Sequence, residues 1–371
     1  MPFFVDDARP FRSLAGIFLF WKAYLLAIAL GSGVSPAYDT SILASFGVPK
    51  GDKLEPLIGI FVANISHLLS AFVLYKLSLT VSKNSKLSLI SAMLHILSPA
   101  GLFLSAPYNE SPYALLSFMG YLFFAKAVLS DGRTLAHSVS LVASGLWFGF
   151  AVNFRSNGTL NGILFAMELL HEVSLPPTWS SIQRRLALIA GGSAVAVGFV
   201  APQVIAYRTY CYDVAESELR PWCTRRLPSI YTFVQERYWN VGFLRYWTPG
   251  NIPLFLLAGP MLYILTKSGT NFLLNPGVLN PGTQRTPTSK YQVGFLGSMA
   301  LTQLILTGLA ITTYHVQIIT RISSGYPLWY WWLARLLSDS KTAGTGRNIV
   351  LFMIMYASVQ GALFSSFLPP A

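Results

Sequence analysis

The sequence predicts an all-α, polytopic integral membrane protein. Of its 371 residues, 53% are hydrophobic and only 11% are charged, and the mean hydropathy is +0.52. A soluble domain averages roughly 25% charged residues, so a water-soluble globular fold is excluded. Intrinsic disorder is excluded as well, because it requires low hydrophobicity and high charge. The apolar residues gather in long runs, which is typical of several membrane spans.

A membrane-spanning helix needs about 20 mostly apolar residues, and about ten runs approach this length. They are Leu14–Val34, Leu57–Val81, Leu87–Ala106, Pro112–Leu129, Leu135–Val152, Leu160–Leu170, Leu186–Tyr207, Ile252–Leu265, Val293–Thr313 and Ile349–Phe367. Leu160–Leu170 and Ile252–Leu265 are short, so we interpret them as partial or broken spans. The first run contains Lys22 and has no clean small-residue cleavage site after it, which favours a signal anchor over a cleaved signal peptide.

The net charge of +12 would suggest nucleic acid as the partner of a soluble protein. Here the basic residues lie mostly in loops, so no nucleic-acid partner is expected and their distribution indicates orientation. Alternate connections between the second and seventh runs carry seven basic residues, and the other connections carry only Arg155. The seven are Lys76, Lys83, Lys86, Lys126, Arg133, Arg184 and Arg185. This bias predicts a cytosolic N-terminus.

Residues 1–371 are therefore expected to form a single membrane domain. The expected lumenal loops are about 35–56, 107–111, 153–159, 208–250 and 314–347, and residues 267–290, rich in Gly, Pro, Asn and Thr, are expected to form a cytosolic loop. The 208–250 loop carries six arginines against the charge rule, yet the alternation of spans places it in the lumen. Its Cys211 and Cys223 are spaced for a disulfide, which needs an oxidising lumen. Two free thiols are the alternative.

Several chemical motifs are absent from the sequence. It has no P-loop, no GxGxxG that opens a helix and no Asp-x-Asp pair, and His171-Glu172 is not followed by a second His at metalloprotease spacing. We therefore expect no metal and no cofactor.

Polar residues concentrate in the expected lumenal loops. The substrate-binding candidates are Tyr108, Asn109, Arg155, Asn157, Asn240, Arg245, His315, Gln317 and Arg321. Aromatic rings with amides suit a sugar, and arginines suit a phosphate through bidentate hydrogen bonds. Because Trp and Tyr also anchor proteins at membrane interfaces, we interpret Tyr326 and Trp329–Trp332 as anchors. Arg155 opposes the charge rule, and both a functional and a structural role stay open for it.

Six stretches carry a family resemblance. They are Tyr38–Ser41, Ser98–Ala114, Phe154–Gly158, Ala201–Gln203, Tyr238–Pro260 and His315–Ala334. Through them the chain resembles the GPI mannosyltransferase 2 family, endoplasmic-reticulum membrane enzymes of the dolichol-phosphate-sugar-using GT-C class. The Tyr238–Pro260 stretch is the longest and most specific of the six.

The resemblance implies a reaction. Dolichol-phosphate mannose donates the second mannose of the GPI precursor lipid in α-1,6 linkage, with inversion of the anomeric configuration. Such a transfer needs a carboxylate as general base on the acceptor hydroxyl. The resemblance further implies that no metal takes part, and that a small membrane subunit is a partner.

One departure concerns the carboxylate itself. Family members carry a Trp-Asp motif in the first lumenal loop, whereas this chain contains no Trp-Asp dipeptide, and only Ile42–Leu57 separates the matching stretches there. In its absence, Glu110 and Asp39 are weak candidates for the catalytic carboxylate. The alternatives are an inactive family member, a non-catalytic membrane scaffold of the same fold, and a transporter. Transporters often show repeats and midplane polar groups, which this sequence lacks, so the enzyme scaffold is favoured.

Overall fold

The computed structural model describes residues 54–130, 134–212, 214, 219–275, 279 and 290–366. All regular structure in these ranges is helical, which confirms the all-α prediction. The α-helices are α3 (Leu54–Ser82), α4 (Ser85–Ile96), α5 (Glu110–Leu129), α6 (Leu135–Phe154), α7 (Gly162–Val173), α8 (Trp179–Cys211), α9 (Ile230–Arg237), α10 (Ile252–Leu274), α11 (Lys290–Thr312), α12 (Ile319–Ile322), α13 (Leu328–Ser338) and α14 (Ala343–Ser366). The 3₁₀ turns η1 (Gly101–Leu104), η2 (Ser156–Asn161) and η7 (Ser323–Gly325) lie in the connections.

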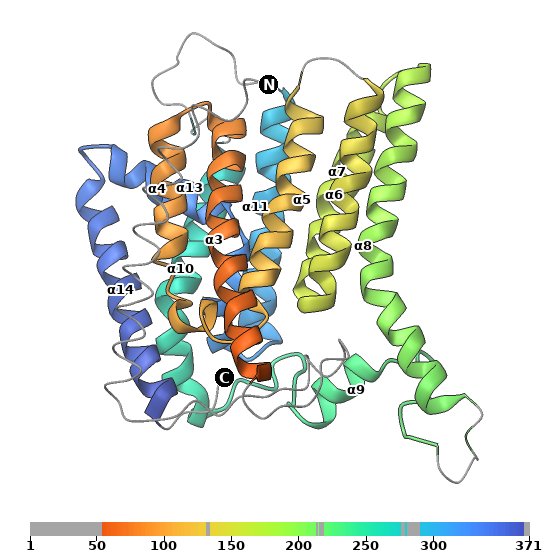
Figure 1. The fold of residues 1–371 in the computed structure, drawn as a ribbon, viewed down its shortest axis with the longest axis vertical. Coiled ribbons are helices and arrows are strands. Elements are labelled where there is room, and N and C mark those ends of the chain that lie inside the picture. Colours follow the sequence, from red (N-terminus) through yellow and green to blue (C-terminus); the bar gives the residue numbers. More distant parts are fainter. Residues whose placement is uncertain are drawn as a thin grey trace.

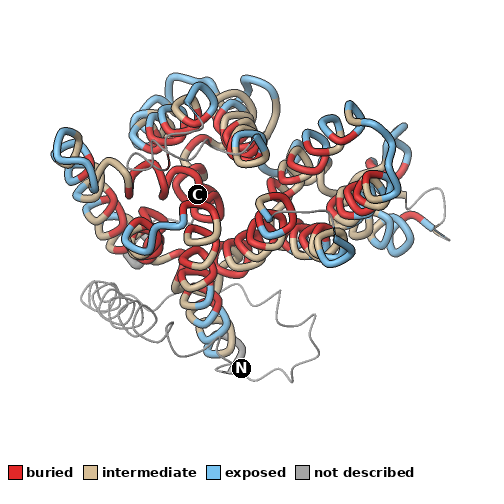
Figure 2. The backbone as a smooth tube through the Cα atoms, turned by 90° about the horizontal axis from the view of Figure 1, so that it is seen from above, coloured by how far each residue is buried: buried red, intermediate tan, exposed pale blue. Residues whose placement is uncertain are grey.

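The long helices stand roughly side by side (Figure 1). Neighbouring pairs follow the order α4, α3, α5, α6, α8, α7, α11, α10, and α13 packs between α10 and α4. Buried residues face the inside of this arrangement and exposed residues face outwards (Figure 2). We call the end that holds 105–110 and 154–161 the pocket end. The other end holds the connections at 83–86, with Lys83 and Lys86, and at 174–178, and we call it the basic end.

Six of the described helices are long and apolar enough to cross a membrane. They are α3, α5, α6, α8, α10 and α11, which confirms a multi-pass membrane protein. The expected first span, Leu14–Val34, and the expected loop at 35–53 lie outside the described residues. The expected run Leu87–Ala106 forms a shorter helix, because α4 ends at Ile96 before η1. The short run Leu160–Leu170 corresponds to α7, a short helix of 12 residues.

The expected cytosolic loop at 267–290 begins too early, because α10 continues as a helix to Leu274. Its last turns pack on α11, where the Gln303 side-chain nitrogen donates to the Leu265 carbonyl and to the Ser268 hydroxyl, each over 2.8 Å. Phe272 is buried in the same contact. The Ser, Gly and Thr residues that suggested a loop are therefore tolerated here inside a packed helix.

The expected lumenal loop at 314–347 is wrong, since it contains the buried helix α13. The Trp331 indole nitrogen donates to the Ser78 hydroxyl over 2.7 Å, and the Tyr330 hydroxyl lies 3.0 Å from His95 Nδ1. Ser78 is one turn from the basic end of α3, so α13 carries the chain away from the pocket end (Figure 1). The prediction of interface anchors at Tyr326 and Trp329–Trp332 is also wrong, because all five side chains are buried in the core.

Small residues let α6 and α8 approach closely. A Cβ added at Gly149 on α6 would lie 2.6 Å from the Ala194 carbonyl oxygen on α8, and Gly145 and Gly198 meet the facing backbone in the same way. Close backbone contact through glycines is a common basis of helix pairing in membranes. It fixes α6, whose last residue, Phe154, leads directly into the site.

Candidate active site

A cavity of 440 Å³ opens at the pocket end of the bundle. Its lining comes from segments that are far apart in sequence: the residues before α5, the end of α6 with η2, α9 with the loop after it, and the segment after α11. The lining residues are Tyr108, Asn109, Phe154, Arg155, Ser156, Asn157, Tyr231, Gln235, Trp239, Val241, Tyr314, His315, Ile318, Arg321 and Ile322. Six of the nine expected substrate-binding residues are among them.

Two arginines of the cavity share one buried carboxylate. Arg321 Nε donates to Glu110 Oε1 over 2.6 Å, and Arg155 forms an ion pair with the same oxygen. The Glu110 side chain is 0% exposed, and its Oε2 has no hydrogen-bond partner among the described residues. Two guanidinium groups of the cavity wall thus converge on one carboxylate oxygen.

Local structure explains why these three side chains meet. Glu110 is the first residue of α5, where a carboxylate interacts favourably with the helix dipole, and Arg155 directly follows the last residue of α6. Arg321 lies on the single turn α12, and its guanidinium carbon sits 4.1 Å from the Phe103 ring centre and 5.0 Å from that of Tyr108. The two rings hold the guanidinium plane and leave its edge for hydrogen bonds.

Asn157 supports the floor of the cavity. Its side-chain nitrogen donates to the Tyr113 hydroxyl over 2.9 Å and to the Tyr326 hydroxyl over 3.2 Å. Both rings are fully buried. The Asn157-Gly-Thr159 sequon is therefore engaged in internal packing, and its amide is not free to carry a glycan.

Aromatic side chains form the opposite wall. His315 Nε2 lies 2.6 Å from the Trp239 carbonyl oxygen, and the His315 ring stacks on Tyr246 with centres 4.5 Å apart. Tyr231 is held by a 2.7 Å hydrogen bond between its hydroxyl and that of Ser156. Burial raises the pKa of Tyr314 to about 12, so its hydroxyl stays protonated and can donate a hydrogen bond to a ligand.

Three expected substrate-binding residues do not line the cavity. The Gln317 side-chain oxygen accepts from the Tyr246 hydroxyl over 2.9 Å, Arg245 pairs with Glu236 at 3.4 Å, and Asn240 is a left-handed turn residue with φ of 50°. Each shapes the loop behind the wall. The catalytic candidate Asp39 lies outside the described residues, and Glu110 lies behind the two arginines.

Four polar lining residues, Ser156, Tyr231, Gln235 and Tyr314, were not among the expected substrate-binding residues. Tyr231 and Gln235 are four residues apart on α9, so they share one face of that helix. The four-residue spacing could have indicated this shared face. The helix itself was not expected, because it is short and coincides with no long apolar run.

A disulfide joins Cys211 and Cys223, whose Cα atoms are 5.6 Å apart. It ties the end of α8 to the segment that leads into α9, and Trp222 is buried against it. On α9, a hydrogen bond from Arg225 and a longer one from Arg245 lower the pKa of the exposed Glu236 carboxyl. The α9 arm is therefore fastened at two points beside the cavity.

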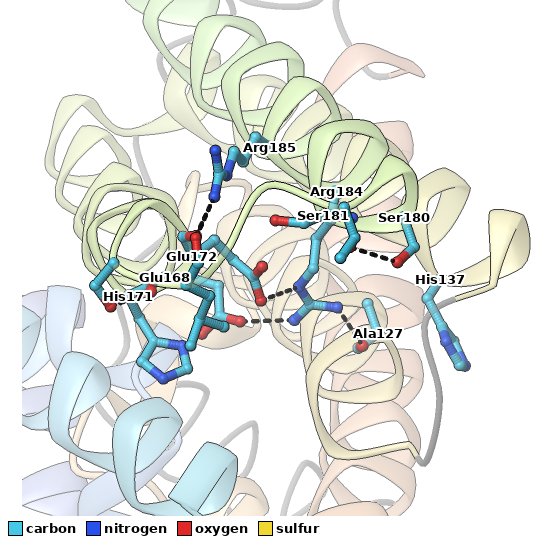
Figure 3. Close-up of polar contacts among 12 residues, drawn as sticks. Ala127, His137, Glu168, His171, Glu172, Ser180, Ser181, Arg184 and Arg185 are labelled. Carbon is cyan, nitrogen blue, oxygen red and sulfur yellow. Dashed lines mark hydrogen bonds and ion pairs between the residues drawn. The ribbon is translucent and has the colours of Figure 1, made fainter.

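A second polar cluster lies at the basic end (Figure 3). Arg184 on α8 contacts Glu168 at 2.6 Å and Glu172 at 3.1 Å, both on α7, and donates to the Ala127 carbonyl over 3.3 Å. Glu168, His171 and Glu172 lie close enough to hold a metal ion. Because the Arg184 guanidinium already forms ion pairs with both carboxylates, this cluster fits a structural clamp between α5, α7 and α8.

The bundle and its cationic, aromatic-lined cavity are those of a membrane-embedded glycosyltransferase, and the family comparison agrees. The family model described as "Mannosyltransferase (PIG-V)" matches residues 52–371. The chain belongs to this family of mannosyltransferases.

Two similar proteins share the description "GPI mannosyltransferase 2". A "GPI mannosyltransferase 2" from Gibberella zeae is 41% identical over 419 aligned positions that cover 98% of both chains. One from Chaetomium globosum is 51% identical over 338 positions, covering 85% of this chain and 71% of the relative. Among solved structures, an Archaeoglobus fulgidus oligosaccharyltransferase is 13% identical with a TM-score of 0.44, covering 88% of this chain and 46% of that one.

Proposed function

We propose that this chain binds dolichol-phosphate mannose at the lumenal face of the endoplasmic-reticulum membrane, as the family member that adds the second, α-1,6-linked mannose to the GPI precursor lipid. The observation that carries the proposal is the pair Arg155 and Arg321 on one cavity wall, with a single carboxylate between them. Arginines suit a lipid-linked phosphate, because guanidinium groups bind phosphate oxygens in a bidentate way.

The opposite wall suits the sugar. Tyr231, Trp239 and His315 offer ring faces, while Asn109 and Gln235 offer amides to sugar hydroxyls. A mannose whose anomeric carbon is bonded to the phosphate would lie between the arginines and these rings. This arrangement supports a phosphate-linked sugar as the ligand.

The transfer itself needs a base. The acceptor hydroxyl oxygen forms a bond to the anomeric carbon, the bond from that carbon to the phosphate oxygen breaks, and the hydroxyl proton passes to a carboxylate. Dolichyl phosphate leaves as an anion, which Arg155 and Arg321 would hold, so no general acid is needed. The two guanidinium groups would supply the charge neutralisation that a metal supplies elsewhere, so we propose a metal-independent reaction.

The described part of the cavity wall supplies no base for this step. The described lining residues include no carboxylate, and the sequence has no Trp-Asp dipeptide. The alignment with the Gibberella zeae relative occupies 419 positions, more than the 371 residues of this chain, so the relative contains segments without a counterpart here. We infer that the chain binds the donor and transfers mannose slowly or not at all. We also propose that a small membrane subunit is a partner of this chain.

The test of the donor site is Arg155→Lys. This change keeps the charge but loses the planar fork, so dolichyl phosphate should bind about tenfold more weakly to the purified chain in nanodiscs, equivalent to about 1.4 kcal/mol. Arg245→Lys is the matched control, because Arg245 is exposed, pairs with Glu236 and does not line the cavity. Equal affinity of Arg155→Lys and the parent chain would assign Arg155 a structural role only.

A further inference from the structure

The helix α9 carries part of the cavity wall, yet no core of its own holds it in place. Tyr231 and Gln235 of α9 line the cavity, while none of the eight residues of α9, all of them described, is buried. Isolated helices shorter than about 12–15 residues are only marginally stable in water. The position of α9 beside the cavity must therefore come from its contacts with other elements.

Gln203 on α8 supplies one of these contacts, at the N-terminus of α9. Its side-chain oxygen accepts hydrogen bonds from the Tyr231 backbone amide over 3.1 Å and from the Ser229 hydroxyl over 3.0 Å. Ser229 in turn caps the helix, because its hydroxyl oxygen accepts from the Thr232 amide over 3.2 Å. The first amides of a helix have no partner inside it, so Gln203 and Ser229 together satisfy two of them.

Two further contacts hold the same tyrosine. Phe199 lies four residues before Gln203 on α8, so both side chains share one face of that helix. The Phe199 ring packs edge-on against the Tyr231 ring, with centres 5.7 Å apart. The Tyr231 hydroxyl lies 2.7 Å from that of Ser156 in η2. Tyr231 is thus held at its backbone, at its ring and at its hydroxyl by three separate contacts.

We propose that Gln203 is a positioning residue for sugar recognition, which fixes the first turn of α9 so that Tyr231 and Gln235 contact the mannose of the donor. The inference rests on the proposed function and deepens it, since it takes the α9 side of the cavity as the sugar side. Gln235 follows Tyr231 by about one turn, so a shift of the first turn moves both side chains. Gln203 is not among the lining residues, and it acts through α9 alone.

The experiment compares two probes that share the tail and the phosphate and differ in the sugar, dolichyl phosphate mannose and dolichyl phosphate. The binding of each to the full chain in nanodiscs is measured for the parent, for Gln203→Leu, which removes the acceptor oxygen, and for Gln203→Glu, which keeps it. The matched control is Gln292→Leu. Gln292 is also half-buried, and its side-chain nitrogen donates to the Val81 carbonyl over 3.2 Å at the basic end, away from the cavity.

We expect Gln203→Leu to bind dolichyl phosphate mannose about tenfold more weakly, equivalent to about 1.4 kcal/mol, and to bind dolichyl phosphate as the parent does. Gln203→Glu and Gln292→Leu should bind both probes as the parent does. Hydrogen exchange, followed by mass spectrometry of short overlapping peptides, provides a measurement without ligand. The Tyr231 amide should exchange faster in Gln203→Leu than in the parent or in Gln203→Glu.

Three results would contradict the inference. Unchanged binding of dolichyl phosphate mannose by Gln203→Leu, or an equal loss for both probes, would overturn it and leave the proposed function standing. Unchanged exchange of the Tyr231 amide in Gln203→Leu would overturn it as well, whatever the affinities. If the parent chain bound neither probe, the proposed function would be wrong, and the role of Gln203 in sugar recognition with it.

Discussion

Two glutamates of this chain are each bridged by two arginines, and burial separates their roles. Glu110 is fully buried between Arg155 and Arg321, whereas Glu236 is 43% exposed between Arg225 and Arg245. Exposed pairs contribute little, because water screens them. Removing one partner of a buried pair leaves an uncompensated charge. Glu110 is therefore a positioning residue that holds both arginines at the cavity wall.

We expect Glu110→Gln to destabilise the protein by about 3–5 kcal/mol, seen as a fall of several degrees in Tm in detergent. Dolichyl phosphate should restore part of this loss, because its phosphate compensates the two guanidinium charges. Glu236→Gln is the matched control and should leave Tm and binding unchanged. If Glu110→Gln and Glu236→Gln lowered Tm equally, burial of the carboxylate would not explain the effect of the substitution.

Asn157 and Arg321 illustrate how far the site could be predicted from residue type alone. Both were expected to bind substrate, because amides and arginines gather in the expected lumenal loops, and both line the cavity. Yet the Asn157 side-chain nitrogen donates its hydrogen bonds to two tyrosine hydroxyls. These internal partners are Tyr113 on α5 and Tyr326 directly after η7, and a local sequence pattern contains no information about them.

At the scale of elements, the sequence predicts best where one long apolar run coincides with one helix. The uniform apolar composition of α3, α5, α6 and α11 predicts the bounds of these helices closely. It fails for α13, whose Trp-rich sequence is equally typical of an interface anchor and of a buried core helix. The difference is set by partners such as Ser78 and His95 on other helices.

The close contact of α6 and α8 leads to a prediction for Gly149. A Cβ at this position would lie 2.6 Å from the Ala194 carbonyl oxygen, so Gly149→Ala must push the helices apart. We expect a loss of about 1–3 kcal/mol, measured as thermal unfolding in detergent. Gly297→Ala on α11 is the control, because a Cβ there meets nothing within 4 Å and alanine favours the helix. Equal stability of Gly149→Ala and the parent would show that the interface yields without strain.

At the scale of the whole molecule, charge and chemistry divide between the two ends. Lys83 and Lys86 lie at the basic end, and the cavity lies at the other. The charge rule therefore predicts that the cavity faces the lumen.

Glycosylation reporters test this orientation. An acceptor site inserted near Thr224, in the arm beside the cavity, should be glycosylated in cells. One inserted near Ser130, at the basic end, should stay unmodified. A glycan at the Ser130 site and none at the Thr224 site would invert the topology and place the cavity in the cytosol.

The last prediction concerns activity. Inverting transfer needs a carboxylate within roughly 3 Å of the acceptor hydroxyl. Among the described residues the nearest carboxylate, that of Glu110, is fully buried and ion-paired with two arginines, and no carboxylate lines the cavity. Loss of a positioned base typically lowers the rate about 10²–10⁴-fold. We therefore expect this 371-residue chain not to restore surface GPI-anchored proteins in cells that lack the second GPI mannosyltransferase.

The control is the same chain with a relative's first lumenal loop, including its Trp-Asp motif, inserted between Ile42 and Leu57, and this version should restore them. Both versions should bind dolichyl phosphate equally, which separates the loss of a base from the loss of the fold. Restoration by the unmodified chain would place the base elsewhere. Glu110→Gln and Asp39→Asn would then identify it, because a variant that removes the base must abolish the restored surface proteins while the other does not.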